Sequence, residues 1–480
     1  MGARPYLSRH VSDRWLAGAI AVVAFIAQYY RHATFRSSTY DMAVFEQVVW
    51  KMAHGHGATS SLTAWNTFGD HLSPVLLVFV PLYRLAATPL WFFAAQAIAV
   101  GIGVLCIRPL AVAAGLPERG RAVTLLLAAY AISPAIWNGV LGDFHPTTVA
   151  VPVLLIGCTV ALKHRHRDMW LVLGALILLR DDLALAGVAL AAIGWTTDTR
   201  RGRQVRGAIV ATGLAWTVIG AQVGAALGAS RHFEARYGYL GTSLTDAATH
   251  PFHAIAGVLS HLFATNNVVP VLALLVPLAL LPLGRPAWAL LAGFVALPTL
   301  LATDPNLHSS AYHYGAPVAP FLFLAAAGTL ARFDLSAYRR VVFYGAPLAT
   351  ASFLFAGPLS TGALTAQAPN PGDVRAALRT VKATDVVVAT GYVAPHVADR
   401  ATLLPFPYPF LEASHVLPLD PEVTSTSAKK QATVDVVIVA PSELEGPELI
   451  DHFLNDPTVI DEFTQENFGD VMVFRRKTGG

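Results

Sequence analysis

Long apolar runs separated by short polar segments dominate the chain up to about residue 357. A helix that crosses the hydrocarbon core of a bilayer needs about 20 mostly apolar residues. Because runs of about this length recur, the pattern predicts an α-helical polytopic membrane protein. The candidate spans cover residues 15–35, 89–112, 122–140, 147–162, 207–228, 268–284, 287–303, 315–331 and 341–357.

One apolar stretch, residues 169–195, carries the sequence Arg-Asp-Asp at 180–182. As a single helix it would hold three charges at mid-membrane, which is costly unless they are paired or hydrated. Basic clusters at 163–167 and 200–206 flank the stretch, and short cytoplasmic loops concentrate Lys and Arg. We therefore expect both flanks in the cytoplasm, with two short helices that meet at residues 180–182 on the outer side.

The apolar run Leu72–Leu85 is short for a span and contains Pro74 and Pro81. It predicts a re-entrant or interfacial helix on the outer side. With these assignments the chain crosses the plasma membrane about 11 times. The N-terminus is then expected in the cytoplasm and the C-terminus outside the cell.

The pattern changes after residue 357. A helical segment, DVRAALRTV, is followed by the β-branched runs VVVAT and VDVVIVAP and by VMVFRR at the end of the chain. Such short runs are typical of buried strands. We therefore expect two domains: a transmembrane domain over 1–357, whose outer loops carry the chemistry, and an extracytoplasmic α/β domain over 358–480.

Composition agrees with a membrane protein, because 54% of the residues are hydrophobic and only 13% are charged. A soluble surface of this size needs more charge. Cys106 and Cys158 both lie in apolar runs, so we interpret them as packing residues. Membrane lipids are the expected surroundings, and no nucleic-acid partner is expected.

Ionisable and aromatic residues gather in the segments predicted to be outside. Five segments far apart in the sequence then converge on one face, which predicts a pocket at the membrane–water boundary. The first segment contains Tyr40, Asp41, Glu46, Asp70 and His71, the second Asp143 and His145, and the apex Arg180, Asp181 and Asp182. The third contains Arg231, His232, Arg236, Tyr237, His250 and His253, and the fourth Asp304, His308, Tyr312, His313 and Tyr314.

Each of these residues also has a purely structural interpretation. Asp41 could cap the helix that begins near Met42, and Asp70 could cap the re-entrant helix. The DFHP sequence at 143–146 could be an ordinary turn, and water could satisfy the histidines of the fourth segment. The charges at 180–182 are the hardest to explain in this way, because burying them in an apolar stretch is expensive.

A carboxylate beside a lipid surface can act as general base toward a hydroxyl. Arginine and histidine can hold a phosphate and stabilise it as a leaving group. This combination suits glycosyl transfer, in which Asp41 deprotonates the acceptor and a polyprenyl phosphate departs. A divalent cation held by Asp41, Asp143 and the histidines is a competing use of the same residues, although no spacing such as HExxH supports it. No other cofactor is indicated.

A set of short sequences is spread from about residue 39 to 410: YDMAVFEQVVW, FGDHLSPVLLVFVPLYRL, DFHP, RDDLAL, ARYGYLGTS, AYHYGAPVAPFLF and APHVADR. As a set they resemble the family named domain of unknown function 2079, which often has Glu-Asp where this chain has Asp181-Asp182. That family is similar to GT-C glycosyltransferases. The resemblance implies many spans, a catalytic acidic residue in the first outer loop, here Asp41, and an outer C-terminal domain. His396, in APHVADR, either shapes an acceptor site or lies in a turn that packs the small domain on the loops.

The resulting hypothesis is a membrane glycosyltransferase that moves a sugar from a polyprenyl-phosphate donor to a glycan or lipid acceptor at the outer face. One alternative is a transporter or flippase of a lipid-linked or anionic substrate. Transporters place ionisable groups near the midplane and often contain inverted repeats, whereas the charges here collect at one face. A second alternative is a non-enzymatic envelope assembly protein.

Overall fold

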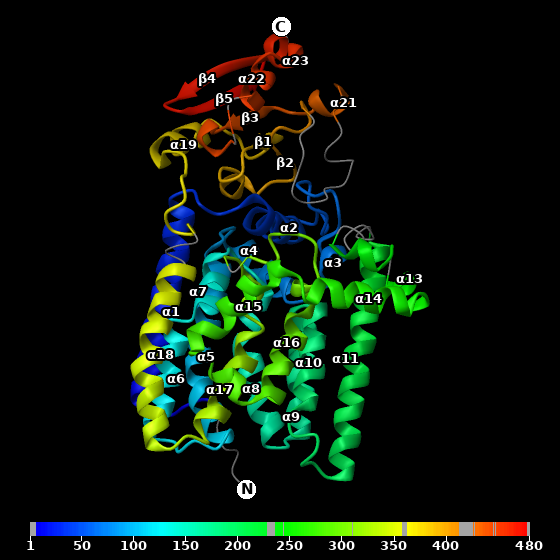
Figure 1. Cartoon of the computed structure of the whole chain (residues 1–480). Coiled ribbons are helices and arrows are strands. Elements are labelled where there is room, and N and C mark those ends of the chain that lie inside the picture. The colour runs from blue at the N-terminus through cyan, green and yellow to red at the C-terminus, as the bar shows by residue number, and fades with distance from the viewer. Residues whose placement is uncertain are drawn as a thin grey trace.

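The computed structural model describes residues 6–477, except 228–235, 243, 310, 358–361, 412–425, 427, 445 and 447. Arg231 and His232 thus lie outside the described residues. A bundle of helices carries a small mixed α/β unit on one end (Figure 1). We call this end the sheet-bearing end. The two chain termini lie at opposite ends of the molecule (Figure 1).

Four helical segments are each long and apolar enough to cross a membrane alone. They are α1 (Val11–Ala33), α5 (Leu90–Ala113), the pair α6 (Arg121–Ala131) and α7 (Pro134–Leu141), and α11 (Arg200–Ala226). A bent pair of segments, Pro251–Leu262 and Thr265–Leu278, meets at 53° and could form a fifth span. The prediction of about 11 crossings therefore stays a prediction.

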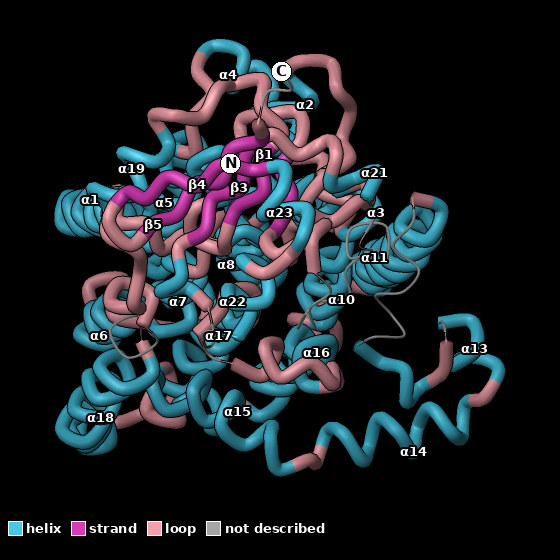
Figure 2. The backbone as a smooth tube through the Cα atoms, turned by 90° about the horizontal axis from the view of Figure 1, so that it is seen from above, coloured by secondary structure: helices cyan, strands magenta, loops and turns pink. Residues whose placement is uncertain are grey.

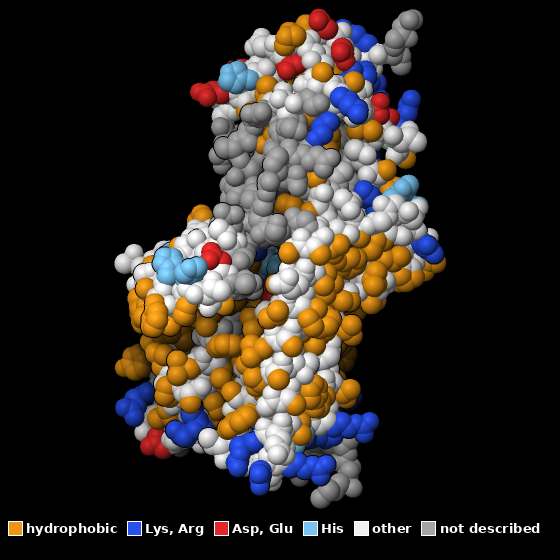
Figure 3. All heavy atoms as spheres, turned by 90° about the vertical axis from the view of Figure 1, so that its right-hand side faces the viewer, with side chains coloured by type: hydrophobic (Ala, Val, Ile, Leu, Met, Phe, Trp, Pro, Cys, Tyr) orange, Lys and Arg blue, Asp and Glu red, His pale blue; other side chains and the backbone are white. Residues whose placement is uncertain are grey.

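Shorter or less apolar helices occupy the other predicted spans. They are α8 (Pro146–Leu162), α9 (His166–Leu179), α10 (Ala184–Ala192), α15 (Val268–Leu275), α16 (Pro286–Leu300), α17 (Ala319–Leu330) and α18 (Leu335–Ala356). Hydrophobic side chains cover much of this helical part, and Lys and Arg gather at the end opposite the sheet (Figure 3). The surface is that of a membrane protein.

The chain breaks at residues 180–183, as the sequence predicts. Arg180 is extended, and a short 3-10 turn, Asp181–Leu183, separates α9 from α10. The Asp181 N–H donates to the carbonyl of Leu72 at 3.0 Å, and Val75 N–H donates to Leu178 O at 2.8 Å. These bonds join the break to the segment just before helix α4. The break at 180–183 and the predicted re-entrant helix therefore lie at the same end of the bundle.

Two loop regions at the sheet-bearing end contain short helices. After α1 come a π-helical turn (Thr39–Ala43), α2 (Val44–Ala53), α3 (Thr67–Asp70) and α4 (Leu76–Leu85). After α11 come α13 (Leu244–Thr249) and α14 (Pro251–Leu262). Seen from above, α13 and α14 lie at the margin of the bundle, beyond α16 and α11 (Figure 2).

The C-terminal part contains one five-stranded sheet in the order β2-β1-β3-β5-β4. Strands β1 (Val387–Ala389), β2 (Leu403–Pro405) and β3 (Val436–Val439) are parallel, whereas β5 (Val471–Arg476) and β4 (Phe463–Phe468) are antiparallel to their neighbours. The helices here are α19 (Pro371–Leu378), α21 (Ala428–Gln431), α22 (Glu448–Leu454) and α23 (Pro457–Glu462). The expected small α/β unit is therefore present.

The sheet is docked on the loop that follows α1. Phe35, Ala43, Val44 and Leu62 belong to the same buried cluster as sheet residues such as Val387. Three polar contacts reinforce this packing: Thr39 Oγ1 to Gly391 O at 2.8 Å, Arg36 Nε to Ala366 O at 2.9 Å, and Ser61 Oγ to Leu403 O at 2.7 Å. One apolar core thus combines residues from both sides of the expected domain boundary.

Candidate active site

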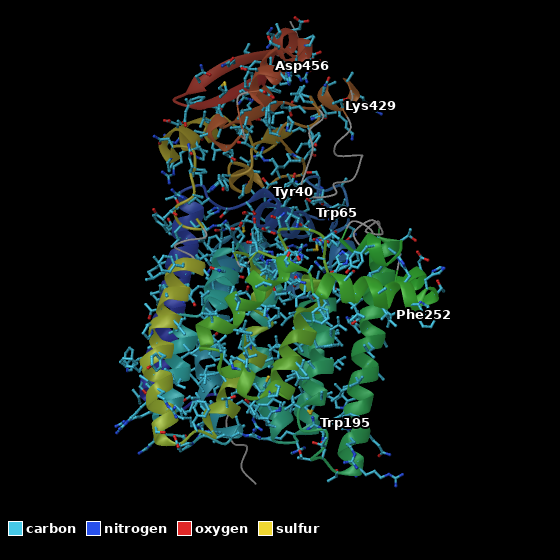
Figure 4. All side chains as sticks on the ribbon, viewed as in Figure 1. Tyr40, Trp65, Trp195, Phe252, Lys429 and Asp456 are labelled. Carbon is cyan, nitrogen blue, oxygen red and sulfur yellow. The ribbon has the colours of Figure 1, made fainter. Side chains whose placement is uncertain are left out.

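A polar cavity of about 490 Å³ lies between the end of the helical bundle and the sheet. Five separate chain segments supply its walls, at about the level of Tyr40 in Figure 4. The residues that matter chemically are Arg31, Arg36, Ser38, Tyr40, Asp41, Asp143, Tyr312, His313, Tyr314 and Tyr392. Three of the five segments predicted to converge contribute to this wall, with Tyr40 and Asp41, Asp143, and Tyr312 to Tyr314. The segment at 180–182 and the described residues of the segment that contains Arg236 do not line it.

Asp41 lies in the π-helical turn between α1 and α2. Its Oδ1 is 3.2 Å from Nε2 of His145, and its Oδ2 accepts a hydrogen bond from the Ser38 hydroxyl at 3.2 Å. About a third of its side-chain surface, 34%, is exposed. The helix-capping interpretation is wrong, because the N-cap position of α2 is Ala43 and no side chain caps that helix.

The ionisation of Asp41 depends on these neighbours. Burial alone would raise its pKa, but the His145 imidazole, the Ser38 hydroxyl and the Arg31 guanidinium lower the pKa below its ordinary value. Stabilising the charged form by hydrogen bonds and nearby positive charge has this effect. Asp41 is therefore a carboxylate at neutral pH.

Asp143 is a different kind of carboxylate. Only 2% of its side chain is exposed, and it forms an ion pair with Arg31. Its Oδ2 also accepts the backbone N–H of Ser38 at 2.7 Å. Asp143 has a positive φ of 67°, which turns the chain between α7 and α8. Both of its oxygens are engaged, so Asp143 holds the wall of the cavity together.

A backbone hydrogen bond and a ring contact fix the position of His145. Its backbone N–H donates to Gln96 Oε1 at 3.0 Å, and Gln96 in turn donates to Gln28 Oε1 at 2.8 Å and to the Asp143 carbonyl at 3.0 Å. The ring of His145 stacks on that of His313, with centroids 3.4 Å apart. A buried amide network therefore positions the imidazole that contacts Asp41.

Cationic groups surround His313. Burial keeps the pKa of this imidazole well below its ordinary value, and the positive charges of neighbouring side chains lower it further. Those neighbours are His145, Arg180, His71 and Arg236. A concentration of basic side chains is the kind of environment that favours an anion.

The charges at 180–182 are paired within the protein. Arg180 Nε donates to Asp182 Oδ1 at 2.7 Å, and its Nη2 contacts the other oxygen of the same carboxylate. Asp181 lies 3.5 Å from Nδ1 of His71. Among the described residues, no carboxylate pairs with Arg236. The charge of Arg236 is therefore available to a ligand. The same holds for Arg36, which lines the polar cavity and donates to backbone carbonyls.

A second, smaller apolar cavity of about 40 Å³ adjoins this region. Residues of α7, α15, α16 and the segment 307–318 line it, including Leu274, Leu300 and Val318. Tyr314 lines both this cavity and the polar one. His308 lines only the apolar cavity, where its Nε2 pairs with the Ala302 carbonyl at 2.6 Å.

Of the residues predicted to form the pocket, six line the polar cavity: Tyr40, Asp41, Asp143, Tyr312, His313 and Tyr314. Glu46 and His396 are among those that do not. Glu46 is buried in α2, where burial and the Asp399 carboxylate raise its pKa well above the ordinary value. His396 stacks on His32, with centroids 4.0 Å apart, and also contacts the ring of Phe35. Neither lines the polar cavity, and the His396 contacts are those of a turn that packs the small unit on the loops. Tyr237, beside Arg236, donates its hydroxyl to the Pro298 carbonyl at 2.7 Å.

Two groups of side chains in the described part of the chain have the spacing of metal ligands. One is His71, Asp181 and Asp182, and the other is His164, His166 and Asp198 near Trp195, at the end opposite the sheet (Figure 4). Arginine already neutralises one carboxylate in each group: Arg180 contacts Asp182, and Arg206 Nε donates to Asp198 Oδ2 at 2.5 Å. A divalent cation at the cavity stays a prediction.

The sequence alone did not single out Arg31, Arg36 or Tyr392. Arg31 and Arg36 lie at the end of the first apolar run, where basic residues are common. Tyr392 belongs to the C-terminal part, 351 residues after Asp41 in the chain. Only the docking of the sheet on the first loop brings it to the cavity.

These observations define an integral membrane protein with a charged cavity at one end of its helical bundle. The chain belongs to the family described as predicted membrane proteins (DUF2079), whose model matches residues 31–444. No curated protein matches the sequence.

Two solved structures of ArnT from Cupriavidus metallidurans are similar over 96% of this chain and 97% of ArnT. The apo structure has a TM-score of 0.51 at 13% identity, and the structure bound to undecaprenyl phosphate has 0.50 at 14%. At such identity the likeness is one of fold. It confirms the predicted resemblance to the GT-C architecture.

Proposed function

We propose that this protein is a membrane glycosyltransferase that transfers a sugar from a polyprenyl-phosphate donor to an acceptor hydroxyl, with Asp41 as general base. The sheet-bearing end is then the extracytoplasmic end, and the N-terminus is cytoplasmic. The observation that carries the proposal is the contrast between two carboxylates of one cavity. Asp41 is partly exposed and ionised, whereas Asp143 is buried in an ion pair.

The two cavities suit the two parts of such a donor. The apolar cavity offers aliphatic walls to a prenyl chain, and Tyr314 connects it to the polar cavity. A phosphate at this junction would lie in the field of Arg236 and of the other cationic neighbours of His313. The likeness in fold to ArnT, solved with undecaprenyl phosphate, supports a lipid of this class.

In the proposed reaction, Asp41 accepts the proton of the acceptor hydroxyl. The hydroxyl oxygen forms a bond to the anomeric carbon while the bond from that carbon to the phosphate oxygen breaks. The electron pair leaves with the polyprenyl phosphate, whose negative charge the cationic cluster stabilises. Attack opposite the leaving group inverts the anomeric centre.

The test compares Asp41→Asn with the full-length wild-type protein in liposomes that contain polyprenyl-phosphate sugars. We expect transfer to fall by at least about 100-fold, the scale of a lost general base, while undecaprenyl phosphate still binds. Asp246→Asn is the matched control, because Asp246 lies in α13, outside the polar cavity, and accepts the backbone N–H of Thr242. Wild-type turnover in Asp41→Asn would refute the role of Asp41. Lipid movement across the bilayer without transfer would favour the transporter alternative.

A further inference from the structure

The carboxyl ends of the parallel strands lie close to the polar cavity. Strand β1 ends at Ala389 and is followed by Thr390, Gly391 and Tyr392, and β3 is followed by a 3-10 turn, Pro441–Glu443. In open α/β sheets, ligands bind outside the carboxyl ends of parallel strands. The location of Tyr392 in the cavity wall agrees with this rule.

Glu443 fixes the turn that carries Tyr392. Its Oε2 accepts the backbone N–H of Tyr392 at 2.5 Å, and its Oε1 accepts the Thr390 hydroxyl at 3.1 Å. Thr390 Oγ1 also accepts the N–H of Ala440 at 3.2 Å, so the turn is tied to the end of β3. One side chain thus satisfies two donors of the turn from the neighbouring strand.

The same turn is tied to the catalytic loop from the other side. Thr39 Oγ1 donates to the Gly391 carbonyl at 2.8 Å, and Thr39 opens the π-helical turn that contains Asp41. One hydrogen bond therefore links the turn that contains Asp41 to the turn that carries Tyr392. Tyr312 also lines the cavity. Burial and the nearby Asp41 and Tyr392 groups raise the pKa of its phenol.

Resting on the proposed function, we propose that Tyr392 and Tyr312 form the acceptor subsite, that the acceptor is a saccharide, and that Glu443 is a positioning residue for Tyr392. An aromatic ring offers an apolar face to the C–H surface of a pyranose, and its hydroxyl offers a polar handle. Both rings lie in the wall that contains Asp41, so a sugar packed against them presents its hydroxyl to the base. The small C-terminal unit, through Tyr392, thereby takes part in selecting the acceptor.

The test measures binding to the full chain in detergent by saturation-transfer NMR, with a panel of methyl pyranosides and disaccharides as one probe and undecaprenyl phosphate as the other. We expect Tyr392→Ala to weaken saccharide binding by about tenfold or more and to leave undecaprenyl phosphate binding unchanged. Tyr392→Phe keeps the ring and is expected to lose less. Tyr344→Ala is the control, since Tyr344 is exposed on α18, outside the polar cavity.

The Glu443 variants test positioning separately. Glu443→Ala removes both acceptors and is expected to weaken saccharide binding as Tyr392→Ala does, whereas Glu443→Gln retains an acceptor for the Tyr392 N–H and restores binding. Equal loss in the Gln and Ala variants would overturn the role of Glu443.

Other outcomes separate the subsite from the proposed function. Saccharide binding that is absent in the wild type, or unchanged in Tyr392→Ala, overturns the subsite. If undecaprenyl phosphate still binds and Asp41 is still required for transfer, the proposed function survives that result. Loss of both kinds of ligand in Tyr392→Ala also overturns the subsite, because the effect is then on the fold.

Discussion

The Nε2 atom of His145 lies 3.2 Å from Oδ1 of Asp41, although 104 residues separate the two in the chain. His145 precedes α8, and its ring stacks on His313, so its orientation does not depend on Asp41. The contact stabilises the ionised carboxyl group and leaves part of that group open to the cavity. The pair is thus suited to keep a base charged beside a lipid surface.

Replacing His145 tests this pairing through the pH profile. His145 lowers the pKa of Asp41, so His145→Ala should raise that pKa. A general base works above its pKa and fails as the pH falls through it. The acid limb of kcat/KM is therefore expected at higher pH in His145→Ala than in the wild type, and His145→Gln, which keeps an N–H donor, should lie between. An unshifted limb in His145→Ala would contradict the pairing.

The ion pair of Arg31 and Asp143 should contribute to stability, in addition to the effect of Arg31 on the pKa of Asp41. Arg31→Met leaves the Asp143 carboxylate buried without its guanidinium, and breaking a buried pair costs about 3–5 kcal/mol. The double change Arg31→Met with Asp143→Asn removes the unpaired charge and should recover part of that loss. Thermal unfolding in detergent measures both. Equal destabilisation by the single and double changes would show that the cost does not come from an unpaired charge on Asp143.

Replacing Arg236 and replacing Arg180 should have different effects on stability. Arg236→Ala is expected to weaken undecaprenyl phosphate binding with little loss of stability, since no carboxylate of the described residues depends on it. Arg180→Ala leaves Asp182 without its bidentate partner, so it should lower thermal stability as well as donor affinity. Binding and unfolding are measured on the same preparations. Unchanged affinity in Arg236→Ala would move the phosphate away from this cluster.

Glu443 makes a pH-dependent contribution to the stability of the sheet. Burial raises its pKa from 4.5 to about 7, against the hydrogen bonds from Tyr392 and Thr390. A carboxyl group whose pKa is raised on folding stabilises the folded state below its unfolded pKa, and this contribution is lost as the pH rises through about 7. We expect Glu443→Gln to remove that dependence between pH 4.5 and about 7, the interval between the unfolded and the folded pKa of Glu443. Hydrogen exchange of β1 and β3 amides measures it. The same pH dependence of exchange in Glu443→Gln and in the wild type would contradict this prediction.

Much of the local structure could be predicted from the sequence. Apolar runs of about the right length became helices, the charges at 180–182 broke one run into α9 and α10, and β-branched runs at 386–390 and 434–441 contain β1 and β3. These features depend on neighbours in the chain and on the cost of placing charge in lipid, both of which are visible in the sequence.

Sequence alone also brought Asp41, Asp143, His145 and His313 to one end of the molecule, because a chain that crosses a membrane repeatedly has few places for its polar residues. The sequence could not show which of these side chains are paired within the protein and which are open to the cavity. Only the tertiary structure pairs Asp143 with Arg31, leaves Asp41 open, and sets Glu46 and His396 outside the cavity. It alone brings Tyr392 to the same wall. The reason is physical: which charge is neutralised depends on contacts of a few ångströms between distant segments, and spacing along the chain does not encode such contacts.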